Sequence, residues 1–386
     1  MPEKFNPCYI IEEQKLRDNL ALLHQVSMQS GVKIILALKA FANWKIFPII
    51  REYISHTTAS SLFEAHLSDQ EFGTKTYTYS PAYEDETFDE LMEYSDHITF
   101  NSISQYNHFK AKVIEWNKLT RHRISMGLRI NPEYSEIKTD LYNPCSPGSR
   151  FGITAEQLPE IPEDIEGLHF HCHCEDDSSA LAHTLEHVEN HFGAHLDKVK
   201  WLNMGGGHLI TRKGYDIQLF ISTVKAIKDK HPNLELIIEP GSAFLWQTGY
   251  LTSRVVDIVE NHGIKTAILN VSFTCHMPDC LEMPYHPEVR GAQIITDSPL
   301  TMGTDSNIYR LGGNSCLSGD YMGYWMFKKP LKIGDEIIFE DMIHYTTVKT
   351  NMFNGITHPS LAIKHLDNSI ELLRKFTYED YKARMD

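Results

Sequence analysis

The chain of 386 residues has little positive charge for its length and no long apolar run. Lys and Arg number 36 against 51 Asp and Glu, so the net charge is −15. Because phosphate binding needs a basic face, this balance argues against a nucleic-acid partner and allows a cationic substrate. No segment approaches the roughly 20 apolar residues of a membrane span, and residues 1–6 lack the start of a secretion signal. We therefore expect no membrane partner and a cytoplasmic location.

Cysteine is also scarce, at seven residues scattered through the chain. An odd count in a long chain without a secretion signal indicates reduced thiols and not a disulfide framework. Charged residues at 23% and hydrophobic residues at 42% are ordinary for a globular protein. The length suggests two domains, although a barrel alone can take about 250 residues.

Apolar segments and helical patterns alternate along the first two thirds of the chain. After a strand at 7–11 and a helix at 12–30, strands are expected at 33–38, 57–59, 76–80, 97–100, 124–130, 166–172, 199–203 and 234–238. Helices are expected between them at 45–54, 62–69, 84–93, 103–117, 154–159, 178–195 and 214–230. This alternation predicts a (β/α)₈ TIM barrel over residues 31–244, with a doubly wound sheet as the alternative.

The pattern changes after Gly241 to β-rich segments with turns between them, among them 251–259, 266–271, 291–297 and 335–346. We predict a second domain, resembling a β-sandwich or β-barrel, from residues 245–386 and the N-terminal residues 1–30. A polar helix is expected at about 356–381.

Lys39 is the unusual residue of the predicted strand that begins the barrel. It ends the apolar run from Val32 to Leu38, where an ammonium group is costly unless it is paired, neutral or used covalently. An aldehyde cofactor bound through a Schiff base would explain it. The alternative is a lysine that extends to solvent from a strand end.

Other chemical groups follow later barrel strands, where active sites of such barrels lie. His171 ends one predicted strand, the glycines Gly205, Gly206 and Gly207 follow the next, and Glu239 ends the last. Three glycines let backbone N–H groups approach a phosphate. A carboxylate facing a pyridine nitrogen would keep that nitrogen protonated, as pyridoxal phosphate chemistry requires.

The segment from His169 to Glu175 also has the composition of a metal site, with three His, two Cys and one Glu. On a strand, however, the histidines and the cysteines would point to opposite faces, and no second cluster with ligand spacing occurs. We therefore predict no metal, and a zinc protein stays as a rival interpretation.

In the second domain, Cys316 and Asp320 lie in a glycine-rich loop, and Tyr345 follows a late strand. A thiol in an exposed loop is available as an acid or base. The Tyr345 hydroxyl would suit a phosphate, or belong to a core aromatic residue with a solvated tip.

Together these motifs resemble the pyridoxal-phosphate decarboxylases with the alanine-racemase-like fold, which include ornithine and diaminopimelate decarboxylases. Further matches are Ser61-x-x-Glu64, the strand with Arg129, and Arg150-Phe151-Gly152. The resemblance implies that Lys39 carries the cofactor and His171 stacks on its ring. It also implies that Glu239 pairs with the pyridine nitrogen and that Cys316 comes from the partner subunit of a homodimer with shared sites. The resemblance implies that Gly205, Gly206, Gly207 and Tyr345 hold the phosphate. Gly241 and Ser242 are also expected to bind the cofactor, although Ser242 replaces an arginine, so that one phosphate contact is missing or supplied differently.

Departures from the family pattern narrow the range of expected substrates. Ser242 stands where relatives have an arginine, and the region around Asp279 and Glu282 is acidic where diaminopimelate enzymes carry an arginine. The chain is thus similar to the carboxynorspermidine and carboxyspermidine decarboxylases, which act on carboxylated polyamines. The expected substrate-binding residues are His276, Asp279, Glu282 and Asp320, because acids attract a polyamine tail. Diaminopimelate decarboxylase and a non-catalytic pyridoxal phosphate carrier are the alternatives, and a racemase is disfavoured for want of a second base.

Overall fold

The computed structural model describes residues 6–283, 285–296 and 307–386, and it divides the chain into two compact units. One unit consists of residues 17–244, and the other of residues 1–16 and 245–386. The first boundary falls inside helix α1 (Glu13–Ser30). Most of this helix, predicted to belong to the second domain, therefore groups with the barrel strands.

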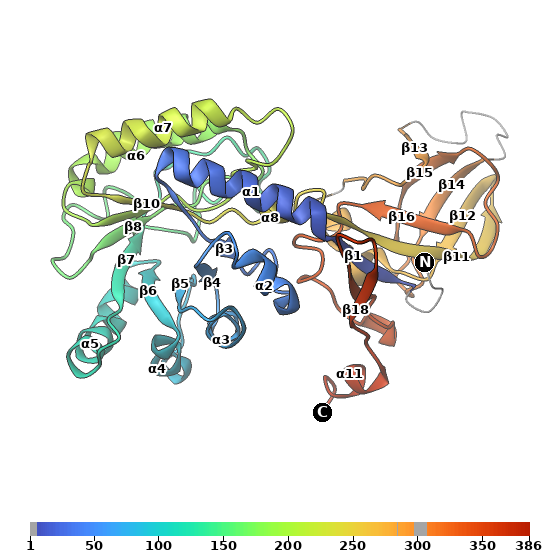
Figure 1. Cartoon of the computed structure of the whole chain (residues 1–386), viewed down its shortest axis with the longest axis horizontal. Coiled ribbons are helices and arrows are strands. Elements are labelled where there is room, and N and C mark those ends of the chain that lie inside the picture. The colour runs from blue at the N-terminus through green and yellow to red at the C-terminus, as the bar shows by residue number, and fades with distance from the viewer. Residues whose placement is uncertain (1–5, 284, 297–306) are drawn as a thin grey trace. The chain divides into compact units, whose positions relative to one another are not determined.

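The first unit is a closed ring of parallel strands, which Figure 1 shows between its helices. In sheet order the strands are β2 (Lys33–Ile34), β10 (Glu235–Ile238), β9 (Trp201–Asn203), β8 (Gly167–His169), β7 (Ser125–Arg129), β6 (Ser95–Phe100), β5 (Thr76–Tyr79), β4 (Thr57–Ala59) and β3 (Leu36–Ala37).

The ring closes at Ile35, where β2 and β3 are two halves of one predicted strand. The Ile35 N–H donates to the Ile238 carbonyl at 3.0 Å, and the Leu36 N–H donates to the His56 carbonyl at 3.1 Å. The strand thus changes its partner from β10 to β4 at this residue. The predicted (β/α)₈ barrel is confirmed, and closure excludes the doubly wound sheet, which has two open edges.

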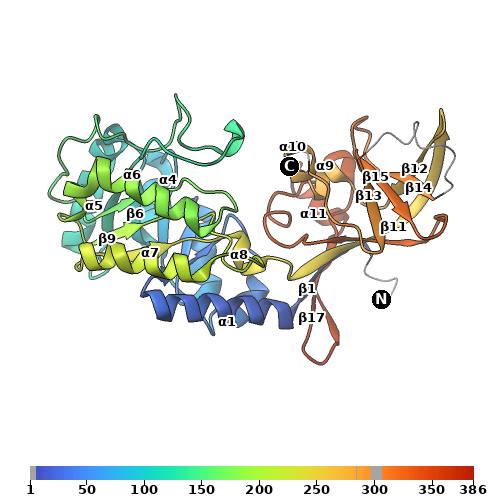
Figure 2. The ribbon, with the colours of Figure 1, turned by 90° about the horizontal axis from the view of Figure 1, so that it is seen from above.

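Helices connect most of the barrel strands. They are α2 (Phe47–Ile50), α3 (Leu62–Leu67), α4 (Asp85–Glu93), α5 (Ile103–Leu119), α6 (Ser178–Leu196) and α7 (Ile217–Lys230). The short helix α8 (Ser242–Leu245) follows β10 and leads out of the barrel. Helices α6 and α7 run side by side in both ribbon views (Figures 1 and 2). The helix expected at 154–159 is wrong, because this segment forms only turns. Pro159 and Pro162 disfavour helical backbone at the residues before them.

One end of the barrel interior is filled by Trp201, whose indole N–H donates to Ser125 Oγ at 2.9 Å. A Cβ on Gly167 would lie 1.9 Å from the indole ring, and one on Gly127 would lie 2.2 Å from it. The two glycines are therefore required by packing. Ile35, Tyr77 and Ile237 complete this buried cluster.

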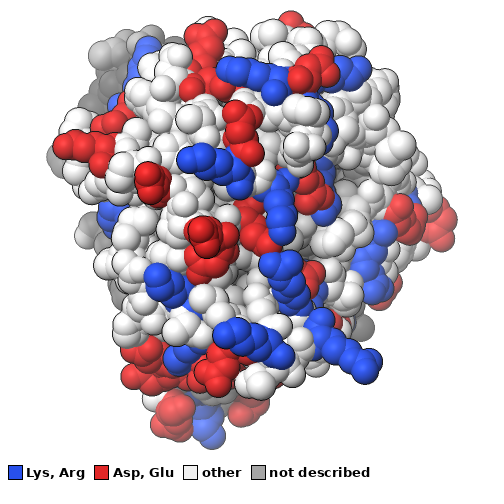
Figure 3. Space-filling view, turned by 90° about the vertical axis from the view of Figure 1, so that its left-hand side faces the viewer, with Lys and Arg blue, Asp and Glu red and all other residues white. Residues whose placement is uncertain are grey.

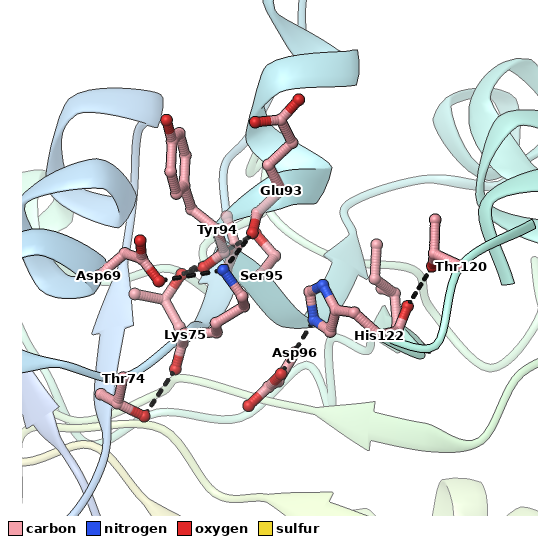
Figure 4. A network of polar contacts seen from close by, with 12 residues as sticks. Asp69, Thr74, Lys75, Glu93, Tyr94, Ser95, Asp96, Thr120 and His122 are labelled. Carbon is pink, nitrogen blue, oxygen red and sulfur yellow. Dashed lines mark hydrogen bonds and ion pairs between the residues drawn. The ribbon is translucent and has the colours of Figure 1, made fainter.

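A polar network surrounds the amino ends of β5, β6 and β7 (Figure 4). Lys75 donates to Asp69 at 3.0 Å and lies over the Tyr94 ring at 5.6 Å, while His122 contacts Asp96 at 3.0 Å. In barrels of this kind the amino ends of the strands contribute to stability and the carboxyl ends to chemistry. The network therefore has a structural role.

The second unit contains one mixed sheet that includes the N-terminal strand. The order is β13 (Ala292–Ile295), β15 (Tyr321–Phe327), β14 (Ile308–Gly312), β12 (Ile264–Leu269), β11 (Gly249–Asn261), β1 (Cys8–Glu12), β17 (Ser360–Lys364) and β18 (Ile370–Arg374), with β16 (Glu336–Glu340) also paired to β11. Strand β1 runs antiparallel to β11 and parallel to β17. The predicted β-rich part that takes the N-terminal strand is confirmed.

The polar helix expected at about 356–381 is wrong. This segment forms the antiparallel pair β17 and β18, followed by the short helix α11 (Tyr378–Lys382). Asn368 adopts a left-handed backbone with φ 66° between the two strands. The segment Asp367-Asn368-Ser369 is a turn signal, and pairing with β1 favours a strand over the local helical propensity.

Candidate active site

Lys39 lies just after β3, among the carboxyl ends of the barrel strands. Its side chain is exposed to solvent. The surrounding protein nevertheless lowers the pKa of its amine, first by removing water from part of its surroundings and further through the charge of Arg129, while Glu239 and Glu64 act in the opposite direction. An accessible lysine with a lowered pKa has a larger neutral fraction, and a neutral amine can act as a nucleophile.

Glu239 follows β10 and is buried, with a relative exposure of 8%. Burial raises the pKa of its carboxyl group, while a hydrogen bond from Asn203 and the charge of Lys39 lower it. The Asn203 Nδ2 amide donates to Glu239 Oε1 at 2.6 Å. This hydrogen bond therefore orients the carboxylate.

His171 lies two residues beyond the end of β8, and its ring is tied to the glycine turn. The Gly206 N–H donates to His171 Nδ1 at 2.9 Å. This nitrogen must carry a lone pair, so the proton of the neutral ring is on Nε2. Burial, and then the charges of Lys39 and Arg129, hold the pKa of His171 well below its usual range. The ring is neutral and has a fixed orientation.

The three glycines after β9 are required by close approaches of the backbone. A Cβ on Gly205 would lie 2.4 Å from the Phe170 carbonyl oxygen. One on Gly206 would lie 2.3 Å from the Glu239 carbonyl oxygen, and one on Gly207 would lie 2.2 Å from the His173 carbonyl oxygen. The turn therefore brings the chains after β8, β9 and β10 together at one place.

Gly241 and Ser242 continue the chain after Glu239. The Gly241 carbonyl accepts from the Phe244 N–H at 3.2 Å, within the turn that opens α8. Ser242 Oγ donates to Glu175 Oε1 at 3.0 Å, so this serine contacts a carboxylate. Glu175 itself has a left-handed backbone with φ 56°.

The histidines of the segment 169–175 do not share one role or one direction. His169 is the last residue of β8 and lies with its ring centroid 5.3 Å from that of Tyr79. His173 contacts Asp176 at 3.3 Å and lies beside His208, with ring centroids 4.8 Å apart. Within the described residues no group of three or more His, Cys, Asp or Glu side chains could hold a metal ion.

Some contributors were not predicted as site residues. Arg129 donates to the His171 carbonyl at 3.2 Å and lies between the rings of Tyr79 and Phe151, at 4.7 and 4.5 Å. Asn203 contacts both Glu239 and the Gly205 N–H. In the sequence, Arg129 stands out only because its strand matches the family pattern. Asn203 stands out only because it lies two residues before Gly205.

The remaining predicted residues all lie in the sheet unit. Cys316 is exposed, and its backbone N–H donates to Asn354 Oδ1 at 2.8 Å. The buried Asp320 carboxylate holds the same loop, because it accepts from the N–H groups of Phe273 at 2.7 Å, Thr274 at 3.1 Å and Ser315 at 3.1 Å. Tyr345 has a left-handed backbone with φ 49°.

Asp279 and Glu282 belong to the short helix α10 (Asp279–Glu282), and both form ion pairs with Lys349. His276, at the end of α9 (Phe273–His276), is fully buried. Its Nδ1 accepts from the Ser272 N–H at 3.1 Å, and its carbonyl accepts from the Tyr9 hydroxyl at 2.5 Å.

The barrel residues fit a phosphorylated pyridine aldehyde. The glycine turn brings three backbone segments together without side chains between them, His171 offers a neutral ring, and Glu239 offers an oriented carboxylate. A barrel of this kind with a separate sheet unit and these groups defines a pyridoxal-phosphate enzyme of the alanine-racemase-like fold.

Comparison with known proteins gives the family. Residues 76–343 match the family described as pyridoxal-dependent decarboxylase, C-terminal sheet domain. The chain belongs to the pyridoxal-dependent decarboxylases, and it is an enzyme that uses pyridoxal phosphate. The resemblance found in the sequence is thereby confirmed. No helix in the described ranges is long and apolar enough to cross a membrane.

Several relatives are similar over nearly their whole length. The chain is 45% identical to carboxyaminopropylagmatine decarboxylase of Synechocystis, over 98% of this chain and 95% of the relative. It is 42% identical to carboxynorspermidine/carboxyspermidine decarboxylase of Campylobacter jejuni, over 98% of both chains. The crystal structure of the carboxynorspermidine decarboxylase from Campylobacter jejuni, complexed with norspermidine, matches with a TM-score of 0.87 and 41% identity over 98% of this chain and 99% of that chain.

Proposed function

We propose that the chain decarboxylates a carboxylated polyamine, carboxynorspermidine or carboxyspermidine, to norspermidine or spermidine in polyamine synthesis. The observation that carries this proposal is the likeness over the full length to an enzyme of that name, in sequence and in fold. The acidic balance of the chain, with a net charge of −15, agrees with a polycationic substrate. We place the enzyme in the cytoplasm.

We assign the cofactor-binding roles to the residues at the strand ends. Lys39 anchors the cofactor, His171 packs on its ring, and Glu239 keeps the pyridine nitrogen protonated. The phosphate lies at the glycine turn, with further contacts from Gly241, Ser242 and Tyr345. Bound pyridoxal phosphate supplies an electron sink for the bond between the substrate Cα and its carboxylate.

The chain's own groups then complete the reaction. Glu239, oriented by Asn203, holds the proton on the pyridine nitrogen while negative charge develops at Cα. Cys316 or Lys39 returns a proton to Cα after carbon dioxide leaves. The exposed position of Cys316 in a loop held by Asp320 supports its use by the partner subunit of a homodimer.

For the substrate tail we propose Asp279 and Glu282, and their ion pairs with Lys349 support this proposal because the same two carboxylates can pair with a cation. A substrate amine would replace the lysine ammonium there. His276 and Asp320, in contrast, make backbone hydrogen bonds that indicate a supporting role in the same part of the sheet unit.

A second candidate substrate is carboxyaminopropylagmatine, because the Synechocystis enzyme named for it is 45% identical to this chain. That molecule ends in a guanidinium group where the carboxylated polyamines end in an amine. Both are cations, and the acids proposed for the tail accept either one, although a planar guanidinium pairs better with two oxygens.

The experiment is a parallel assay of purified enzyme, loaded with pyridoxal phosphate, against carboxynorspermidine, carboxyspermidine, carboxyaminopropylagmatine and diaminopimelate. Amine products are separated by chromatography, and the Lys39→Ala variant gives the background. We expect the highest kcat/KM for a carboxylated polyamine. A higher value for carboxyaminopropylagmatine would support the second candidate, and turnover of diaminopimelate alone would contradict both.

A further inference from the structure

Two thiols face each other beside the segment that carries His171. The Cys145 Sγ–H donates to Cys172 Sγ at 3.5 Å, and both residues belong to the barrel unit. Cys172 directly follows His171 in the chain and is buried, with 1% exposure. Cys145 lies in the long loop between β7 and β8 and is partly exposed. One thiol is therefore accessible to a small reagent and the other is protected.

The surrounding contacts hold the two thiols in this arrangement. Ser135 Oγ donates to the Cys172 carbonyl at 2.7 Å, which fixes the loop to this segment. The Cys145 N–H donates to Asn143 Oδ1 at 2.9 Å, and Asn143 Nδ2 donates to the Ile137 carbonyl at 2.9 Å. The thiol pair thus comes from a loop with its own internal hydrogen bonds and is not a chance contact of two mobile ends.

The chemistry of the two thiols differs. Once Cys145 ionises, the Cys172 S–H can donate to its thiolate, and this contact, assisted by the charge of Arg129, lowers the pKa of Cys145 despite its partial burial. Burial raises the pKa of Cys172 well above its usual range. Because the thiolate is the reactive form, Cys145 is the group that attacks an oxidant, and Cys172 is the group that resolves the product.

We propose that Cys145 and Cys172 form a reversible redox site, in which a small peroxide converts the two thiols into a disulfide. The Cys145 thiolate attacks one peroxide oxygen, the O–O bond breaks, and a sulfenic acid and hydroxide form; the hydroxide takes up the proton that Cys145 released on ionising and leaves as water. The Cys172 thiol then attacks the Cys145 sulfur, the S–S bond forms, and a second water leaves. Two electrons pass from the sulfurs to the peroxide, and an added dithiol reverses the change.

The disulfide would act on the active site through the chain beside it. An S–S bond of about 2 Å requires the sulfurs to approach from their present 3.5 Å separation. Since Cys172 is buried and adjoins His171, the bond ties the loop after β7 to the backbone that positions the ring on the cofactor. We expect a several-fold loss of decarboxylase activity that a dithiol restores.

Peptide mapping tests the proposal without relying on activity. Reduced holoenzyme is treated with one equivalent of hydrogen peroxide, alkylated, digested without reductant and analysed by mass spectrometry. We expect a cross-linked pair of peptides containing Cys145 and Cys172, which disappears after dithiothreitol. The Cys145→Ser variant should lack it, and the matched control Cys174→Ser, at an exposed thiol nearby, should retain it. A disulfide to another cysteine, or a Cys145 peptide that stays unlinked, overturns the proposal.

Activity measurements on the same samples test the consequence. Wild type should lose activity on oxidation and regain it with dithiothreitol, whereas Cys145→Ser should lose clearly less. An equal loss in both proteins would show that oxidation acts elsewhere, for example at Cys316, and would overturn the control of activity by this site. The peptide map does not depend on which substrate the enzyme uses. A failure of the disulfide proposal can therefore be told apart from a failure of the proposed decarboxylase function.

Discussion

Asn203 and Glu239 form a buried hydrogen bond of 2.6 Å between the amide Nδ2 and the carboxylate Oε1. The same asparagine accepts the Gly205 N–H through Oδ1 at 3.0 Å. One side chain therefore aligns the proposed partner of the pyridine nitrogen with the turn proposed to hold the phosphate. Its bond to the carboxylate opposes the burial that raises the pKa of Glu239.

Replacing Asn203 by leucine should remove this support. A hydrogen bond to a charged group contributes about 1.5–3 kcal/mol, so we expect kcat to fall about tenfold or more. The pKa of Glu239 should rise, which moves the acid limb of the pH–kcat profile to higher pH. Asn117→Leu is the control, because Asn117 bonds only to Ile124 in the contacts described. An unchanged acid limb in Asn203→Leu would contradict the assignment.

Lys39→Ala should abolish turnover, with a loss on the order of 10³-fold or more. The variant should also fail to retain cofactor covalently after borohydride reduction, which mass spectrometry measures. Lys33→Ala is the matched control, since Lys33 begins the same strand but pairs with Glu235 at 2.6 Å and Tyr77 at 2.9 Å. Covalent retention at another lysine, or an active Lys39→Ala, would remove Lys39 from its proposed role.

Gly206→Ala should weaken cofactor binding, because the added Cβ would lie 2.3 Å from a backbone oxygen of Glu239. Overpacking of this kind costs about 1–3 kcal/mol, equivalent to a rise of about fivefold to a hundredfold in the Kd of pyridoxal phosphate. Fluorescence titration of the cofactor-free enzyme measures it. Gly193→Ala in α6 should bind normally, since its Cβ meets only the end of the Glu189 side chain.

The sequence predicted the barrel and the strand-end groups because both depend on local order. Parallel strands that alternate with helices place their carboxyl ends at one edge, so Lys39, the glycine turn and Glu239 could be placed together before any coordinates. The C-terminal residues 360–374 were misread because their strands depend on pairing with β1, which is distant in the chain. Local pattern carries no information on such a partner.

Side-chain partners were the part that sequence could not supply. Asp279 and Glu282 were predicted as substrate ligands from their charge, yet their contacts with Lys349 depend on a loop some seventy residues away. The facing thiols Cys145 and Cys172 belong to two segments whose spacing in the chain has no pattern. Asn203 resembles any strand residue until its contact with Glu239 is seen.

His276 provides a test of whether this residue supports the sheet unit or contacts substrate. Burial, with a smaller effect of His358, lowers its pKa to about 3. In the unfolded chain its pKa is ordinary, near 6.5, so the unfolded state binds more protons between these values. The stability that comes from keeping the ring neutral is present above pH 6.5 and is lost as the pH falls toward 3.

The variant His276→Asn keeps an acceptor for the Ser272 N–H but does not titrate. Between pH 7.5 and 5.0 one such histidine contributes about 2 kcal/mol to the change in the free energy of unfolding, and the variant should lack this contribution. Urea titration at both pH values measures the difference. His66→Asn, at an exposed histidine, is the matched control for the substitution itself. A pH dependence unchanged in His276→Asn, together with a raised KM, would indicate a substrate contact; a flatter dependence with normal KM would establish the supporting role.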